Sequence, residues 1–425
     1  MTIRSTTLDC GLRVVTERMP DVRSVTLGFW VGTGSRDEAD HLAGASHFLE
    51  HLLFKGTPTR SAREIAESID AVGGDMNAFT TKEYTAFYVR VLAGSLGLGV
   101  EVLSDLMWSP AFRPDDVECE RQVILEEILM RGDEPSEEVH EVLAEALWPG
   151  HPLGREVLGT EEAIETMTVA DIAGFFGEHY HPANMVLSAA GYLDHDDLCA
   201  QIEQHVAGAA ANDRGAPGPR SLFAERVPPA PDAAAPVTVV HRSTEQAHVV
   251  VGLPALDRHD PDRWALSVLD HALGGGMASR LFQTIREDRG LAYSVYSYRC
   301  AFDDAGALAV YAGTMPAKAH EVLALIHDEL DAVREKGITE RELTVAKGHL
   351  LGEMALSLED SAARMSRIGR SLLAHGEVLA LDDITSLIEG VTLDDVARVG
   401  AEVLAAPRTL AVVGPFTGKD FATGR

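Results

Sequence analysis

Two histidines four residues apart, with a glutamate between them, are the side chains in this chain that best suit metal chemistry. They are His47 and His51, and Glu50 directly precedes the second histidine. Positions i and i+4 lie on the same face of an α-helix, so both imidazoles can bind a single cation. Glu50 would then lie beside the cation without being needed to hold it. The spacing therefore predicts a metal site with one spare carboxylate.

The surrounding segment favours a helix. Apolar side chains recur on one side of residues 43–54, and Lys55-Gly56 supplies a cation and a glycine stop at the end. The pattern H-x-x-E-H is known from inverted zinc peptidases, although short motifs also occur by chance. The alternative is that both histidines are ordinary core residues of an apolar helix. A third ligand elsewhere in the chain would distinguish between these interpretations.

A catalytic zinc ion held by two imidazoles needs one more protein ligand, and a second predicted helix can supply it. Residues 113–131 begin near Pro114, which suits the first helical position, and the acidic residues that follow suit the helix dipole. Glu120 and Glu127 lie two turns apart within the apolar stripe of this helix, whereas Glu126 points to another side. The stripe consists of Val117, Val123, Ile124 and Ile128.

A carboxylate on an apolar helix face is costly unless a cation or hydrogen bonds satisfy it. We therefore predict that Glu127 is the third metal ligand and that Glu120 supports the site by bonding to one of the ligands. The alternative is a solvated helix whose glutamates simply face water.

Three longer segments carry a resemblance to known proteins. Residues 47–57 read HFLEHLLFKGT, and residues 286–295 read REDRGLAYSV. Between them, Gly73-Gly74 precedes Asn77-Ala78-Phe79-Thr80. With Glu120 and Glu127, these segments resemble peptidase family M16, the pitrilysin and insulinase family, in its two-domain bacterial branch similar to the mitochondrial processing peptidase. Glu127 follows the second histidine by 76 positions, the spacing that this branch uses for its third zinc ligand.

The resemblance implies an α+β fold with one zinc ion per chain. The implied fold consists of two homologous, duplicated α/β-roll domains of the LuxS/MPP-like metallohydrolase type, which face each other around a cavity. A stretch rich in Ala and Pro at residues 207–236 lacks helical or strand periodicity and supports the division. We expect a zinc-binding catalytic domain at 1–210, a linker at 211–236, and a metal-free domain at 237–425 that completes the active site.

Repeated patterns indicate that the halves are duplicated. The segment at residues 167–191 recurs at residues 391–414, with an offset of 223 to 224. With an offset of 220, the helix of His51 recurs as a Ser-Val-Leu-Asp-His segment that ends at His271. Ser267 stands where the first histidine would be, so this copy cannot bind metal in the same way. His271 is therefore interpreted as a structural remnant.

Each half alternates strands and helices. In the first half, residues 6–17 and 25–31 are predicted strands, and residues 75–81 and 84–92 form a predicted hairpin. Ser61 with Glu64 is a predicted capping box, which opens a helix that stops at Gly73-Gly74.

The proposed ligands leave one group for proton transfer. Neutral His47 and His51 with Glu127 leave a zinc coordination position open for water, whose pKa the metal lowers toward neutrality. Glu50 is the predicted general base, which takes the proton of that water and passes it to the leaving amine.

Two further roles follow from the resemblance. Arg286 and Tyr293 would donate hydrogen bonds to the tetrahedral oxyanion. If the family resemblance is not used, they are interpreted as an ion-pairing arginine and a packed tyrosine. The strand Asn77-Ala78-Phe79-Thr80 would pair with the substrate backbone, because strand addition accepts varied sequences.

The composition narrows the partners and the location. A formal charge of −30 argues against nucleic-acid and anionic-membrane surfaces. Either plain solubility or a negative chamber that attracts basic peptides explains this acidity. No apolar run reaches transmembrane length and no signal core opens the chain, so cytoplasm is the expected location. The 4 cysteines are scattered, which favours reduced thiols over a disulfide frame or a thiolate zinc site.

Three functions stay open on the sequence alone. The leading one is a zinc metalloendopeptidase that cuts unfolded peptides of limited length in a closed chamber. The others are a non-catalytic assembly or chaperone-like subunit, and a dedicated maturation protease for one peptide precursor. Chelator-sensitive cleavage separates the first from the second, and generic peptides test the third. The family resemblance also implies a homodimer.

Overall fold

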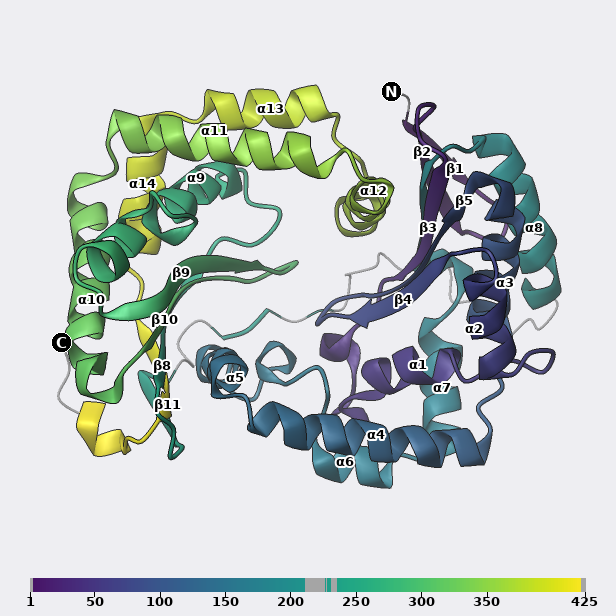
Figure 1. The fold of residues 1–425 in the computed structure, drawn as a ribbon, viewed down its shortest axis with the longest axis horizontal. Coiled ribbons are helices and arrows are strands. Elements are labelled where there is room, and N and C mark those ends of the chain that lie inside the picture. The colour runs from purple at the N-terminus through teal and green to yellow at the C-terminus, as the bar shows by residue number, and fades with distance from the viewer. Residues whose placement is uncertain (1–2, 211–225, 227, 231–234, 422–425) are drawn as a thin grey trace. The chain divides into compact units, whose positions relative to one another are not determined.

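The chain forms two compact units, each assembled from separate segments. The computed structural model describes residues 3–210, 226, 228–230 and 235–421. Each unit is a sheet with helices on both of its faces (Figure 1). The first unit consists of Met1–Ile128, Glu156–Glu225 and Ala355–Val378, and the second of Leu129–Arg155, Arg226–Met354 and Leu379–Arg425.

The first unit contains a six-stranded sheet with the order β1-β2-β6-β3-β5-β4. Neighbouring strands are antiparallel except β2 and β6, which run parallel. This order places β4 at one edge of the sheet. The strands are β1 (Ile3–Thr7), β2 (Arg13–Arg18), β3 (Ser24–Val31), β4 (Asp75–Thr80), β5 (Thr85–Leu92) and β6 (Met185–Gly191).

The start of this sheet differs from the sequence-based prediction. Residues 6–17 do not form one strand but belong to two antiparallel strands, β1 and β2. Between them Gly11 has a φ of 90°, a left-handed conformation that glycine adopts without steric cost. Asp9 and Gly11 are the turn signals in this segment, and the prediction of one continuous strand overlooked them. Strand β3 and the β4–β5 hairpin lie where the pattern predicts them.

Helices cover both faces of the first sheet. One face carries α1, α2, α3, α7 and α8 over a core that includes the buried Phe29, Phe48 and Phe87. The opposite face carries α12, which contacts β2, β3 and β6 and packs against Trp30. The helices of this unit are α1 (Ala45–Leu53), α2 (Ala62–Asp70), α3 (Leu96–Trp108), α6 (Glu161–Thr166), α7 (Val169–His179), α8 (His195–Ala210) and α12 (Ser361–His375), with most of α4 (Pro114–Gly132).

A glycine lets α12 approach the sheet closely. A Cβ atom at Gly369 would lie 2.2 Å from Nε1 of Trp30, so a larger residue would displace the indole. That Nε1 donates to the hydroxyl of Ser188 at 2.7 Å. Arg364 on the same helix pairs with the buried carboxylate of Glu17. The indole nitrogen of Trp30 and one carboxylate oxygen of Glu17 therefore have partners beneath α12, as burial requires.

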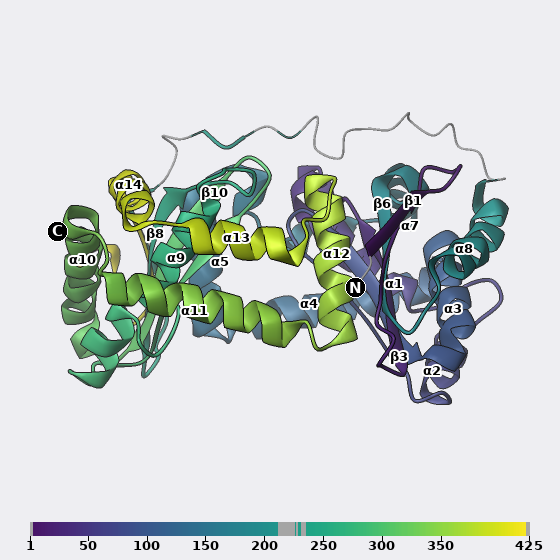
Figure 2. The same cartoon turned by 90° about the horizontal axis from the view of Figure 1, so that it is seen from above.

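The second unit contains a five-stranded sheet with the order β7-β11-β8-β10-β9. Helices α9, α10 and α14 pack on one face, and α5 packs on the other. Figure 2 shows α11 and α13 from above. The elements are β7 (Val237–His241), β8 (Ala247–Ala255), β9 (Ala292–Ala301), β10 (Gly306–Thr314), β11 (Thr409–Gly414), α5 (Pro135–Leu147), α9 (Arg263–Gly274), α10 (Ala319–Lys336), α11 (Glu340–Ser357), α13 (Leu381–Gly390) and α14 (Leu393–Val403).

The two sheets repeat one topology, which confirms the predicted duplication. Strands β7 and β11 pair in parallel as β2 and β6 do, and β9 occupies the edge position of β4. Each unit also takes one helix from the other half of the sequence, α12 in the first unit and α5 in the second. The boundaries 1–210 and 237–425 stay a prediction, and the linker at 211–236 lies largely outside the described residues.

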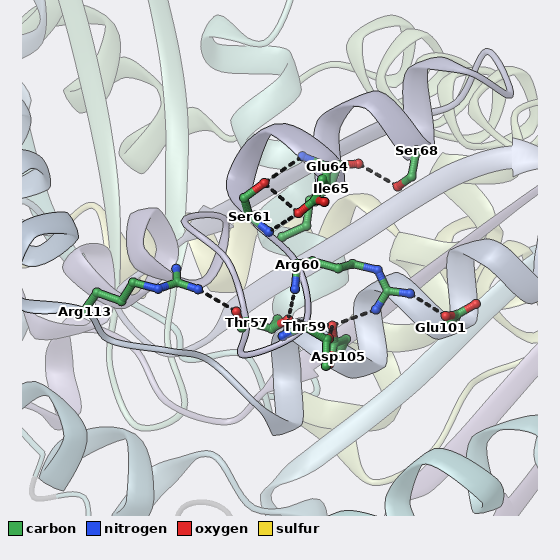
Figure 3. A network of polar contacts seen from close by, with 10 residues as sticks. All are labelled: Thr57, Thr59, Arg60, Ser61, Glu64, Ile65, Ser68, Glu101, Asp105 and Arg113. Carbon is green, nitrogen blue, oxygen red and sulfur yellow. Dashed lines mark hydrogen bonds and ion pairs between the residues drawn. The ribbon is translucent and has the colours of Figure 1, made fainter.

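A polar network fixes the loop that follows α1 (Figure 3). The carboxylate of Asp105, on α3, accepts hydrogen bonds from the hydroxyls of Thr57 and Thr59 at 2.8 and 3.2 Å. It also pairs with Arg60 at 2.7 Å. Arg113, which directly precedes α4, donates to the Thr57 carbonyl at 2.7 Å. The network therefore connects the end of α1 with the beginning of α4.

The same network ends in the predicted capping box, which is confirmed. The hydroxyl of Ser61 accepts from the backbone N–H of Glu64 at 3.3 Å, and the Glu64 carboxylate accepts from the backbone N–H of Ser61 at 2.8 Å. These bonds satisfy two of the free donors at the start of α2.

We expect Asp105→Ala to lower the free energy of unfolding by about 2 kcal/mol, because three donors lose their acceptor and one of them is charged. Glu101→Ala is the matched control, since this carboxylate is 49% exposed and, among the described residues, has one polar partner, Arg60. Its loss should cost less than about 1 kcal/mol. Urea unfolding of both variants measures the difference, and equal losses would show that Asp105 does not organise the loop.

Candidate metal centre

Helix α1 buries its apolar face and leaves both histidines near the surface. The side chains of His47 and His51 are 12% and 18% exposed. At the beginning of the helix, the Glu38 carboxylate accepts hydrogen bonds from the N–H groups of Gly44 and Ser46 at 2.8 and 2.7 Å. These bonds satisfy donors that the helix itself leaves unpaired. The residues packed into the core are Phe48, Leu49, Leu52 and Leu53.

Three potential ligand atoms converge at this surface. The Nε2 atoms of His47 and His51 lie 3.3 Å apart. Glu127 Oε2, from α4, lies 3.5 and 3.6 Å from these two nitrogens. Ligands at 2.0–2.1 Å from a tetrahedral zinc ion are separated by about 3.3–3.4 Å. The donor set therefore fits zinc in both chemistry and spacing, and no other group of three His, Cys, Asp or Glu residues among those described comes together in this way.

Glu120 orients one of the histidines from behind. Its Oε2 atom lies 2.9 Å from Nδ1 of His51, and its carboxylate also pairs with Lys55. Since a carboxylate can only accept, Nδ1 must carry the proton, which leaves the Nε2 lone pair for a metal. The hydrogen bond to Glu120 raises the pKa of Lys55, so the ammonium stays charged. Lys55 was predicted only as a cation at the end of the helix, and its pairing with Glu120 was not predicted, although it follows His51 by one turn.

The register of α4 separates its glutamates. Glu120 is 5% exposed and the Glu127 side chain is 38% exposed, while Glu126 faces solvent. Val123 was assigned to the apolar stripe, which is wrong, because it is 40% exposed. It lies six residues after Val117, and this separation rotates it away from the buried face of the helix.

Glu50 lies beside the three-ligand group but is held by the sheet. Thr80, at the end of β4, donates to its carboxylate at 2.6 Å. Burial raises the pKa of Glu50, and Glu127 adds to this, while the bond from Thr80 and the nearby His51 oppose it. Thr80 was predicted only as part of a substrate strand, because no local pattern indicates a bond between residues 30 positions apart.

The strand Asn77-Ala78-Phe79-Thr80 lies on the open edge of the first sheet. Strand β4 pairs with β5 on one side, and no described strand pairs with its other side. The backbone N–H of Ala78 donates to the side-chain oxygen of Asn77 at 2.8 Å. This edge therefore offers backbone groups that another strand could bind.

Arg286 and Tyr293 lie together in the second unit. Arg286 belongs to a π-helical segment, Phe282–Glu287, a rare geometry that often occurs at functional sites. Tyr293 is the extra residue of a β-bulge, because Gly313 and Thr314 of β10 pair with Ser294 and Ala292.

The bulge turns the Tyr293 ring outward, to 81% exposure. The Arg286 guanidinium lies 5.0 Å from the centre of this ring and 4.7 Å from that of Phe282. The π-helix and Phe282 were not foreseen. Tyr293 is not packed, and within the described part of the chain Arg286 forms only a long ion pair, with Glu287 at 3.9 Å.

The second copy of the metal helix retains one feature of the first. Asp270 accepts a hydrogen bond from Ser297 at 2.5 Å, as Glu50 does from Thr80. In each unit, the bond connects a carboxylate on the helix with the edge strand of the sheet, which is β9 for Asp270 and β4 for Glu50. With Ser267 in place of a histidine, the copy keeps this contact and lacks the ligand pair.

Among the described residues, the structure has no helix with the length and apolarity that a membrane crossing requires.

Comparison with models of protein families matches both parts of the chain. Residues 13–161 match the model described as insulinase, peptidase family M16. Residues 166–350 match the model described as peptidase M16 inactive domain.

Whole-length relatives agree with these matches. An uncharacterized zinc protease from Streptomyces coelicolor is 48% identical over 422 residues, which cover 99% of this chain and 91% of the relative. An uncharacterized zinc protease from Mycobacterium tuberculosis is 47% identical over 416 residues, with coverage of 98% and 94%. A solved structure of a peptidase M16 inactive domain from Pseudomonas fluorescens shares the fold, with a TM-score of 0.90 at 21% identity and coverage of 98% of both chains. On the strength of these full-length matches, the chain belongs to peptidase family M16.

Proposed function

We propose that this protein is a zinc-dependent endopeptidase that hydrolyses unfolded peptides. One observation carries the proposal: three ligand atoms lie 3.3 to 3.6 Å apart, and Glu50 lies next to them without being one of them. This is the arrangement that a hydrolytic metal site needs, since a carboxylate remains for proton transfer.

The ligands would be His47, His51 and Glu127. When bound, zinc supplies a Lewis acid that polarises the scissile carbonyl and makes water a stronger acid. Glu120 keeps the proton of His51 on Nδ1, and Lys55 pairs with the same carboxylate, so the ligand ring is held in one tautomer and one orientation.

Glu50 would move the proton. Its carboxylate accepts a proton from the attacking water as the new C–O bond forms, and returns it to the amine nitrogen as the C–N bond breaks. Thr80 holds the carboxylate through one oxygen at 2.6 Å, which leaves the other oxygen for this transfer. Because Thr80 belongs to β4, the general base and the edge strand are positioned together.

The substrate would bind in extended form along β4. Strand addition uses main-chain hydrogen bonds, so it accepts many sequences but requires an unfolded segment. The Asn77 amide now covers the Ala78 donor and would turn away as a peptide adds to the edge. A cavity of about 260 Å³ lies beside the strand; Phe54, Ile65 and Met76 form part of its apolar lining, and Asp70 and Asp75 also line it. It suits an apolar substrate side chain.

Arg286 and Tyr293 would stabilise the oxyanion of the tetrahedral intermediate. Their exposure and mutual contact support the role, because a donor that meets substrate cannot be packed in a core. The guanidinium over the ring holds both side chains in one arrangement. The intact set of His47, His51, Glu127 and Glu50 speaks against a purely structural subunit.

We expect Glu50→Gln to abolish peptide hydrolysis while the protein keeps about one zinc per chain, because this carboxylate transfers protons and is surplus to a three-ligand site. Elemental analysis and a fluorogenic peptide assay measure the two properties. If the variant loses its zinc, Glu50 is a ligand and the assignment is wrong.

Glu127→Gln should strongly reduce zinc affinity and activity, because the amide is a poor ligand. Glu126→Gln is the matched control one position away, and it should change little since its side chain faces solvent. Glu120→Gln should weaken zinc binding by about ten- to hundredfold, as the loss of a supporting hydrogen bond does. Zinc titration against a competing chelator measures all three. Equal damage from the substitutions at 126 and 127 would contradict the proposed register.

Tyr293→Phe should lower kcat by about 10²- to 10³-fold without changing zinc content, as removal of an oxyanion donor does. Tyr192→Phe is the control, because Tyr192 is also exposed, at 49%, and also lies under an arginine, Arg18 at 5.9 Å. Steady-state kinetics on one peptide compares the two. A full rate for Tyr293→Phe would remove this residue from the mechanism while leaving the zinc site untouched.

A further inference from the structure

A second cavity lies wholly within the second unit, between α9, the segment that follows it, and α11. Its volume is about 350 Å³, within the range of small-ligand sites. Polar lining comes from His271, Ser279 and Arg341, and apolar lining from Ala272, Ala278 and Val345. No part of the proposed peptidase mechanism uses these residues.

One buried polar group at this cavity, the hydroxyl of Ser279, has no hydrogen-bond partner among the described residues. Ser279 is 3% exposed, and its hydroxyl makes no hydrogen bond. His271 is 9% exposed, and its ring stacks on His349 with centres 4.1 Å apart but forms no hydrogen bond within the described part of the chain. A buried hydroxyl without a partner costs free energy that a ligand could recover.

The backbone is shaped around the His271 ring. A Cβ atom at Gly275 would lie 2.7 Å from Nδ1, and one at Gly276 would lie 3.1 Å from Cε1. Glycines here let the chain fold over the imidazole and hold it at the cavity. Burial lowers the pKa of His271, and the neighbouring His349 lowers it further, so near neutral pH the ring is uncharged and has one N–H to donate.

The cavity is lined by one acidic and one basic side chain, and only the acidic one, Glu342, has an ion-pair partner among the described residues. Glu342 is committed to Arg280, with contacts of 2.6 and 2.8 Å. Although burial acts in the opposite direction, the bonds from Arg280 and Thr339 lower the pKa of Glu342 to about 2. Arg341 is exposed and forms no ion pair within the described residues. Its guanidinium is therefore available to an anion.

We propose that this cavity binds the carboxylate of a small aliphatic acid. Arg341 pairs with the carboxylate, Ser279 and His271 donate hydrogen bonds to it, and the two alanines with Val345 contact a short apolar body. Guanidinium groups match the planar carboxylate with two parallel hydrogen bonds.

The lining favours a monoanion over phosphate. Among the described residues, Arg341 is the one cation at the cavity without an ion pair, and its single charge balances a carboxylate but not a dianion. The apolar part of the lining has no counterpart in phosphate. A free aliphatic acid and the C-terminal residue of a peptide share the required chemistry. The site does not depend on the proposed peptidase activity, and its test is a binding measurement.

The test is a ligand-observed NMR titration of the full-length protein with three probes. Isovalerate represents a free acid, N-acetylvaline represents a peptide C-terminus, and N-acetylvalinamide has the same body without the carboxylate. We expect saturable binding of at least one acid and none of the amide. Preference for N-acetylvaline assigns the site to peptide ends, and equal or better binding of isovalerate assigns it to free acids. No saturation by either acid up to about 10 mM would overturn the proposal.

Variants locate the binding. Arg341→Gln and Ser279→Ala should each weaken it by at least about tenfold, the usual effect of losing a bond to a charged group. Arg370→Gln is the control, since Arg370 is also exposed and forms no ion pair among the described residues. Without ligand, Ser279→Ala should melt at or above the parent temperature, because it removes an unpaired buried hydroxyl. Unchanged affinity in both cavity variants would place the acid elsewhere and reject this site.

Discussion

The buried carboxylate of Glu120 is the contact on which the metal centre depends. It belongs to α4, yet both of its partners, His51 and Lys55, lie on or just after α1. A carboxylate at 5% exposure is tolerated because a cation and an N–H donor satisfy it. This requirement fixes α4 against α1, and Glu127, two turns further along α4, then reaches the two histidine nitrogens.

The sheet supplies the other half of the site. Thr80 ends the edge strand and holds Glu50, so the group that would move protons and the strand that would bind peptide share one rigid element. Asp105 supports the end of α1, because it binds Thr57 and Arg60 in the loop that follows this helix. A reaction that needs sub-ångström alignment benefits from such double support.

Duplication explains what the second unit keeps and what it has changed. Its sheet order repeats the first, and Asp270 still bonds to an edge strand through Ser297. The ligand pair is gone, and the remaining histidine, His271, lines a cavity instead of a metal site. The bulge at Tyr293 has no counterpart in the register of β4 with β5, which is continuous. One architecture has therefore acquired different chemistry in its two copies.

The sequence by itself determined the features that depend on near neighbours. Helical spacing places His47 and His51 on one face, the Ser61–Glu64 pair caps α2, and the alternation of residues 75–92 produces the hairpin. Glu120 and Glu127 also follow from spacing along one helix, although Val123 shows that an apolar stripe predicted from such spacing can include a residue that the fold leaves exposed.

Only the tertiary structure decided which distant groups meet. The bonds of Glu50 to Thr80 and of Lys55 to Glu120, the outward turn of Tyr293, and the exchange of α5 and α12 between halves were not readable from the chain. Each depends on how two surfaces pack, and packing is set by the shape and burial of many residues at once rather than by local periodicity. The unpaired Ser279 hydroxyl is the clearest case, because a serine in a sequence does not reveal whether anything will lie within reach of its oxygen.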